Sequence, residues 1–165
     1  MPVEAAINRA AGSSDKEETR GNRTAADAKE VTMNPSSARI LVIDDEQDIL
    51  DLVADILDAN GFTVDTARCG SLGLVKLAEN RFDLLLCDVG MHEMNGWEVV
   101  ERVRKTDPVT GVVLVTGWGS TLSEDDARHK GVDAILGKPF EMRTLVGTVE
   151  RVLGVCQERA GTGAA

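Results

Sequence analysis

Tyrosine is absent from this chain of 165 residues, and aromatic side chains make up only 3% of it. Hydrophobic residues still account for 42%, so the chain can form a core, but that core must be aliphatic. No apolar run approaches the roughly 18 residues that a membrane-spanning helix needs. The N-terminus also lacks the apolar segment of a secretory signal. The sequence therefore predicts neither a membrane protein nor a secreted one.

Cysteine is scarce, and its three positions, Cys69, Cys87 and Cys156, show no CxxC spacing. Such a pattern favours two core thiols and one thiol near the C-terminal end over metal ligands or disulfides. Together with the missing signal sequence, it predicts a cytoplasmic protein.

Positive charge is in short supply, because 18 Lys and Arg residues face 28 Asp and Glu residues for a net charge of −10. The segment 39–154 carries 12 basic and 21 acidic residues and so holds nearly all of this excess. Nucleic acids bind mainly through Lys and Arg, so this composition predicts no nucleic-acid partner. Acidic side chains suit a cation site, although most of them are expected on solvated helix faces.

The composition divides the chain into a folded part and two tails. Residues 1–37 have almost no large apolar side chains and are predicted to form a disordered N-terminal tail. Met33 is an alternative start, because the composition changes just after it. Residues 38–155 form the predicted domain, and residues 156–165 are predicted to be a flexible C-terminal tail.

Strand and helix patterns alternate five times within the domain. Short runs rich in Val, Ile and Leu predict strands buried on both faces, and apolar residues at 3/4 spacing predict the helices between them. Such alternation predicts an α/β fold with a parallel sheet covered on both faces. The predicted strands are 39–43, 62–67, a run ending at Asp88, a run ending at Thr116, and 132–136. The predicted helices are about 46–60, 71–80, 96–106, 122–130 and 141–155.

Polar side chains follow four of these apolar runs. They are Asp44-Asp45, Asp88, Thr116 and Lys138-Pro139. In an open α/β sheet, the carboxyl ends of parallel strands converge on one crevice where ligands bind. We therefore expect three acids, one hydroxyl and one amine to meet there, a set suited to a divalent cation and a phosphoryl group beside a carboxylate.

The segment 39–154 resembles the receiver domain of two-component response regulators. The resemblance lies in VIDDE (42–46), CDVGMHEMNG (87–96), VTGWG (115–119) and GKPF (137–140), which occur in the family's order and at close to its usual spacing. It implies a flavodoxin-like (βα)5 three-layer sandwich with parallel sheet order 2-1-3-4-5. Residues 38–155 would then be the receiver domain.

Asp88 is the predicted phosphoryl acceptor, because a carboxylate oxygen can attack phosphorus to give an acyl phosphate. Asp44 and Asp45 are predicted to bind a divalent cation together with Asp88, since like charges this close need neutralising. Mg²⁺ is the expected ion, with Mn²⁺ as an alternative. The resemblance implies that Asp45, Asp88 and the backbone carbonyl of Gly90 ligate it directly, with Asp44 acting more through water.

Lys138 is predicted to place its ammonium against the phosphoryl oxygens. Thr116 is predicted to offer them a hydroxyl. The resemblance also implies that Pro139 follows a cis peptide bond, which would aim Lys138 inward.

The chain departs from the family pattern at several positions. His92 stands where Pro is frequent, and we interpret it as a solvated loop residue near the site. Ile135 replaces a common aromatic, which puts the family's Thr–aromatic switch in doubt. Gly90 and Trp118 occupy positions that, in the family, tune the lifetime of the phosphoryl group. The predicted switch and partner surface consists of Thr116, Trp118, Ile135 and Pro139.

The predicted function is a stand-alone receiver that takes a phosphoryl group from a sensor or hybrid histidine kinase, or from a histidine phosphotransfer protein. It would signal through protein contacts to an unknown target, without turnover as an enzyme. One alternative is a phosphorylation-independent scaffold, for which binding would survive Asp88→Asn. The other is an Asp-nucleophile phosphatase, but enzymes of that kind carry a DxD segment where this chain has Asp44-Asp45. Steady turnover of generic phosphate esters would favour this alternative.

Overall fold

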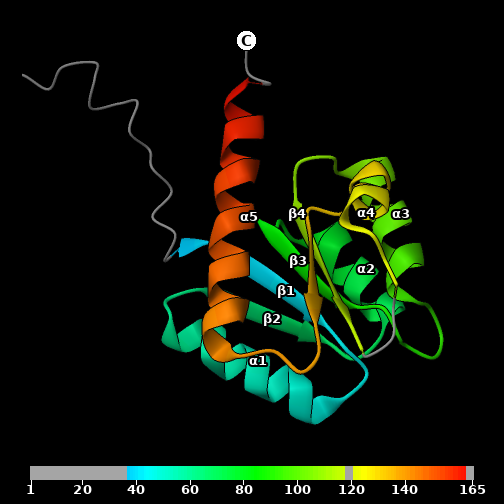
Figure 1. The fold of residues 1–165 in the computed structure, drawn as a ribbon, viewed down its shortest axis with the longest axis vertical. Helices are drawn as coiled ribbons and strands as arrows, with labels where there is room; N and C mark the ends of the chain where they lie inside the picture. Colours follow the sequence, from blue (N-terminus) through cyan, green and yellow to red (C-terminus); the bar gives the residue numbers. More distant parts are fainter. Residues whose placement is uncertain (1–36, 118–120, 163–165) are drawn as a thin grey trace, which may run out of the picture. The chain divides into compact units, whose positions relative to one another are not determined.

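Five short strands form one parallel sheet in the order β2-β1-β3-β4-β5 (Figure 1). The computed structural model describes residues 37–117 and 121–162. The strands are β1 (Arg39–Ile43), β2 (Thr63–Ala67), β3 (Leu84–Asp88), β4 (Gly111–Thr116) and β5 (Ala134–Gly137). Their order and direction confirm the predicted flavodoxin-like topology.

Helices cover both faces of the sheet, which gives the predicted three layers (Figure 1). On one face lie α1 (Gln47–Ala59) and α5 (Met142–Thr162). On the other lie α2 (Gly70–Glu79), α3 (Gly96–Thr106) and the short α4 (Glu124–His129). The alternation read from the sequence is thus confirmed, with element ends that differ by a few residues.

The core is aliphatic, as the composition predicts. Every residue of the central strands β3 and β4 is buried, because each faces a helix layer on both sides. Leu50, Val53 and Leu57 of α1 pack against one face, and Val99, Val100 and Val103 of α3 pack against the other. Each fully buried side chain of this kind contributes about 1.5–3 kcal/mol. The core therefore fixes the strand ends that carry the polar residues.

The start of α3 lies directly beside β3. Asn95 and Glu98 form a reciprocal capping box, in which each side chain accepts a hydrogen bond of 3.0 Å from the other's backbone N–H. The first helical residue is Gly96, where an added Cβ would lie 2.7 Å from the carbonyl oxygen of Asp88. Glycine is thus required for α3 to begin this close to the end of β3.

The last helix is longer than predicted. It was expected to end at Val155, but α5 continues to Thr162, so the helix end is wrong and residues 156–162 are helical rather than frayed. Cys156 continues the buried stripe of Val149 and Val152, and one turn further Arg159 forms an ion pair of 2.6 Å with Asp133. These contacts to distant parts of the chain hold a segment whose composition alone indicates a tail.

Two of the sequence expectations concern residues that the structure does not describe. Apart from Ser37, the predicted disordered segment 1–37 lies outside the described residues, and so does the alternative start at Met33. Within the described residues, no helix has both the length and the apolar character needed to cross a membrane.

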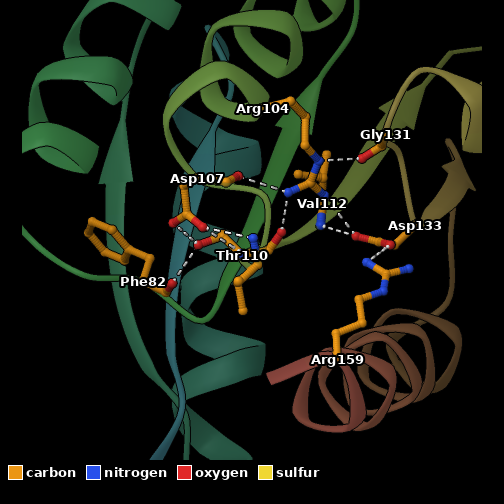
Figure 2. Close-up of polar contacts among 9 residues, drawn as sticks. Phe82, Arg104, Asp107, Thr110, Val112, Gly131, Asp133 and Arg159 are labelled. Carbon is orange, nitrogen blue, oxygen red and sulfur yellow. Dashed lines mark hydrogen bonds and ion pairs between the residues drawn. The ribbon is translucent and has the colours of Figure 1, made fainter. Parts of the chain in front are cut away.

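Polar contacts join α3, α5 and the residues just before β4 and β5 (Figure 2). Arg104 near the end of α3 donates hydrogen bonds to the carbonyl oxygens of Asp107 at 3.2 Å and Thr110 at 2.7 Å. It also pairs at 3.1 Å with Asp133, which precedes β5 and receives Arg159 of α5 as well. We call Arg104, Asp107, Thr110, Asp133 and Arg159 the basal network.

Asp107 should stabilise the fold only above acidic pH. Burial tends to raise the pKa of this carboxyl, but hydrogen bonds from the hydroxyl and N–H of Thr110 and the N–H of Val109 outweigh it and lower the pKa. A depressed folded-state pKa means that the stabilisation is present above the unfolded pKa, about 3.9, and is lost as pH falls through the folded value. Asp107→Asn should therefore cost about 1 kcal/mol at pH 7, because water screens this partly exposed group, and progressively less as pH falls below the unfolded pKa.

Urea denaturation of both proteins between pH 7 and pH 3 measures this difference. Asp55→Asn is the matched control, since Asp55 is exposed on α1 and forms no hydrogen bond or ion pair within the described residues. A pH-independent gap between wild type and Asp107→Asn would contradict the assignment.

Candidate phosphoacceptor and metal site

Asp44, Asp88 and Lys138 meet at the carboxyl end of the sheet. The ammonium nitrogen of Lys138 lies 2.9 Å from Oδ2 of Asp44 and 3.3 Å from Oδ1 of Asp88. The three side chains are 18%, 4% and 9% exposed for Lys138, Asp44 and Asp88 respectively. One cation is therefore shared between two largely buried carboxylates, which leaves the group with a net negative charge.

The strand register explains why these distant residues converge. Ile43 of β1 pairs with Cys87 of β3, so Asp44 and Asp88, the next residue of each chain segment, lie side by side. Thr116 at the end of β4 pairs with Gly137 at the end of β5, and Lys138 follows directly. Asp44, Asp88 and Lys138 therefore lie together at the strand ends, as the sequence predicts.

The charges in this group perturb one another. Burial raises the pKa of the Asp88 carboxyl, and repulsion from Asp44 raises it further, while Lys138 opposes both. Burial alone would lower the pKa of Lys138, but its hydrogen bond and attraction to Asp44, together with the attraction of Asp88, raise it instead. Lys138 therefore stays charged, and the cost of charging Asp88 would be reduced by a further cation.

Acidic oxygens suitable for a cation cluster just after β1. Asp44, Asp45 and Glu46 each offer an oxygen, and these atoms lie within 4.8 Å of one another. Mg²⁺ prefers oxygen ligands, keeps several waters and is commonly held by one or two carboxylates. The donor set therefore fits Mg²⁺ or Mn²⁺, and Asp88, adjacent to Asp44, extends it toward the predicted phosphoryl position.

His92 contacts the predicted metal ligand Asp45. Its ring is 93% exposed, which agrees with the interpretation as a solvated loop residue, yet Nδ1 lies 2.8 Å from Oδ2 of Asp45. The contact joins residues 47 apart in the sequence. No sequence pattern pointed to this partner.

Thr116 and Pro139 flank Lys138. Thr116 is 5% exposed, and its carbonyl oxygen accepts a hydrogen bond of 2.7 Å from the backbone N–H of Lys138. The peptide bond between Lys138 and Pro139 is cis, as predicted. The predicted contact of the Thr116 hydroxyl with a phosphoryl oxygen stays a prediction.

The remaining predicted residues lie at the margins of this group. A Cβ built on Gly90 would be 3.9 Å from Oδ2 of Asp88, so the glycine borders the carboxylate, while the role of its carbonyl stays a prediction. Ile135 is half-buried and packs against the core on the α3–α4 side. Trp118 lies outside the described residues.

Glu46 belongs to the site, although the sequence argument did not include it. Its carboxylate lies 3.7 Å from the ammonium of Lys138, and its backbone N–H donates a hydrogen bond of 2.9 Å to Asp44. A third acid after Asp44-Asp45 was visible in the sequence. We interpreted Glu46 as the start of the following helix, because the spacing of residues in the sequence does not show where a side chain points at a strand end.

Comparison with known proteins identifies this arrangement. A family model for the response regulator receiver domain matches residues 40–150. The chain therefore belongs to the receiver domain family of two-component response regulators.

Individual relatives agree with this assignment. The chain is 36% identical to the transcriptional regulatory protein CpxR of Klebsiella pneumoniae over 115 residues, which are 70% of this chain and 49% of the relative. It is 31% identical to the receiver protein CpdR of Brucella abortus over 70% of this chain and 96% of the relative. The chain thus spans about half or less of the first curated relatives, but nearly all of CpdR.

Solved receiver structures share the fold. A CheY-like receiver domain protein of Methanospirillum hungatei matches with a TM-score of 0.69 and 31% identity, over 74% of this chain and 98% of the neighbour. A receiver domain protein of Clostridium thermocellum matches with a TM-score of 0.69 and 29% identity, over 73% and 97%.

Proposed function

We propose that Asp88 accepts a phosphoryl group from a phosphohistidine of a sensor or hybrid histidine kinase, or of a histidine phosphotransfer protein. The observation that carries this proposal is the ammonium of Lys138 held between the largely buried carboxylates of Asp44 and Asp88. A cation fixed 3.3 Å from the acceptor oxygen can stabilise negative charge as it develops on an incoming phosphoryl group.

The transfer forms one bond and breaks one. A carboxylate oxygen of Asp88 attacks phosphorus, the phosphorus–nitrogen bond to the donor's imidazole breaks, and the leaving imidazole takes up a proton. Lys138 pairs with the phosphoryl oxygens, and the hydroxyl of Thr116 donates to one of them. Most of the catalysis is positioning and charge stabilisation.

A divalent cation completes the proposed site. Asp44, Asp45, Asp88 and the carbonyl of Gly90 would hold Mg²⁺, or Mn²⁺, and the bound ion would neutralise the clustered acids and the transferred phosphoryl oxygens. This charge balance agrees with the raised pKa of Asp88, which reflects burial and repulsion from Asp44.

The proposed output is a change of protein contacts. Phosphorylation adds charge and acceptor oxygens, which Thr116 and Lys138 would follow. Their movement would alter the neighbouring surface that includes Trp118, Ile135 and Pro139. We propose that a cytoplasmic protein target reads this surface, that no nucleic acid or membrane does, and that slow loss of the phosphoryl group makes the chain an acceptor rather than a turnover enzyme.

Intact mass spectrometry with acetyl phosphate and Mg²⁺ tests the proposal. We expect one phosphoryl adduct that hydroxylamine removes, as it does from an acyl phosphate. The adduct should be absent after metal chelation and absent from Asp88→Asn, an isosteric variant that lacks the nucleophile.

Three other results would contradict the assignment of Asp88 as phosphoryl acceptor. A folded wild-type protein without an adduct would reject the phosphoacceptor proposal and favour the scaffold alternative. An adduct that persists in Asp88→Asn would place the chemistry on another residue. Continuous phosphate release from generic esters would support the phosphatase alternative instead.

A further inference from the structure

A pocket lies at the other end of β5 from Lys138. It has a volume of about 560 Å³ and is lined by residues of α3, α4 and α5 and of the turn before β5. Asp133 precedes β5 whereas Lys138 follows it. The pocket therefore lies at the amino ends of the parallel strands and the acidic site at their carboxyl ends. The pocket therefore belongs to neither the acidic cluster nor the proposed phosphoryl position.

Arginines dominate the charged lining. Arg104, Arg128, Arg151 and Arg159 all line this pocket, which we call the arginine pocket. Its one acidic residue, Asp133, is already paired with Arg104 at 3.1 Å and with Arg159 at 2.6 Å (Figure 2). The pocket thus concentrates positive charge in a chain whose net charge is −10.

Two of these arginines have guanidinium groups to spare. Arg128 is exposed and lies 3.7 Å from Glu124 and 3.9 Å from Asp125, which are long contacts at a solvated surface. Arg151 is exposed and forms no hydrogen bond or ion pair within residues 37–117 and 121–162. Like charges gathered in one concave site repel one another, and an anion would relieve this repulsion.

The rest of the lining is apolar. Val132 and Val152 are buried beneath the pocket, and Val155 is 39% exposed although it is a large hydrophobic residue. A pocket of about 300–1,000 Å³ with an apolar wall and a few charged groups is the usual form of a small-molecule site. Guanidinium groups bind phosphate in a bidentate manner and also stack on flat rings.

We propose that the arginine pocket binds a small phosphate ester of the nucleotide class. Arg128 and Arg151 contact the phosphate, and the ring system lies against Val155. The concave shape and the short span of positive charge fit a compact ligand better than an extended polyanion, which needs a long basic stripe. This inference does not depend on phosphorylation of Asp88.

Calorimetric titration of the full chain with AMP and GMP tests the proposal, and amide shifts in NMR spectra locate the site. We expect saturable binding of at least one nucleotide, with shifts centred on Arg151 and Val155. Adenosine, which lacks the phosphate, should bind at least about tenfold more weakly than AMP, because hydrogen bonds to charged groups are strong. Arg151→Glu should weaken binding by about tenfold to a hundredfold.

Arg143→Glu is the matched control. Arg143 is also an exposed arginine of α5 but does not line the pocket, so the two variants have the same net charge. Equal weakening by both variants, equal binding of adenosine and AMP, or no saturable binding of either nucleotide would overturn the proposal. Binding of a polyglutamate peptide that depends on Arg151, without nucleotide binding, would overturn it in favour of an acidic protein partner.

Discussion

Replacing Lys138 with methionine is expected to slow phosphoryl transfer to Asp88 by about 100-fold, because one preorganised charge is lost at the point where negative charge develops. Methionine keeps the length of the side chain but removes the ammonium that lies 3.3 Å from Asp88 and 2.9 Å from Asp44. Burial and repulsion from Asp44, which raise the pKa of Asp88, would then be unopposed by Lys138. Adduct formation from acetyl phosphate, followed by mass, measures the rate.

The same variant should bind Mg²⁺ more tightly than wild type. The ammonium of Lys138 competes with a metal ion for the oxygens of Asp44, Asp88 and Glu46, and its removal leaves their negative charge to the metal. This opposite pair of changes, slower transfer with tighter metal binding, distinguishes a role in charge stabilisation from general damage to the site.

Lys105→Met provides the control for both measurements. Lys105 is exposed on α3, where it forms a surface ion pair of 3.1 Å with Glu101. It should change neither the transfer rate nor the metal affinity. Transfer by Lys138→Met at the wild-type rate would contradict the assigned role, as would weaker binding of Mg²⁺.

The meeting of Asp44, Asp88 and Lys138 was predictable from sequence for a simple physical reason. Strands buried on both faces leave a strong signal in Val, Ile and Leu, and the rules of parallel βα connection restrict how such strands are ordered. Once the strands are placed, the residues that follow them must lie together at the carboxyl end of the sheet. The prediction needed no knowledge of side-chain conformations.

Contacts between exposed or half-exposed side chains were not predictable in this way. His92 on Asp45, Glu46 beside Lys138, and Arg159 on Asp133 depend on rotamers and loop paths that leave no periodic pattern. The end of α5 shows the consequence. Gly161, Gly163 and nearby small residues indicate a tail, yet the ion pair of Arg159 with Asp133 lies within a helix that continues to Thr162.

Arg104→Met should be the most destabilising of the substitutions considered, with a loss of about 3–5 kcal/mol in the free energy of unfolding. The guanidinium donates to the carbonyl oxygens of Gly131, Asp107 and Thr110 and pairs with Asp133. The two charged side chains are 17% and 6% exposed for Arg104 and Asp133. Removing Arg104 leaves these carbonyl oxygens without its hydrogen bonds and takes one of two arginines from the largely buried Asp133.

The two arginines of the basal network should contribute unequally to the free energy of unfolding. The side chain of Arg159 is 47% exposed and pairs with Asp133 at 2.6 Å, so Arg159→Met should cost only about 1 kcal/mol. In Arg104→Met, Asp133 would still pair with Arg159 and accept a hydrogen bond of 2.8 Å from the backbone N–H of Val112. These remaining contacts favour the lower end of the expected loss in the free energy of unfolding.

Urea denaturation of the two single variants and the double variant measures the coupling of Arg104 and Arg159. The double variant should lose more than the sum of the single losses, because only then does Asp133 have no cationic partner among the described residues. Strict additivity would show that the two arginines act independently. A loss below about 1 kcal/mol for Arg104→Met would show that its four contacts do not hold the end of α3 to β4 and β5.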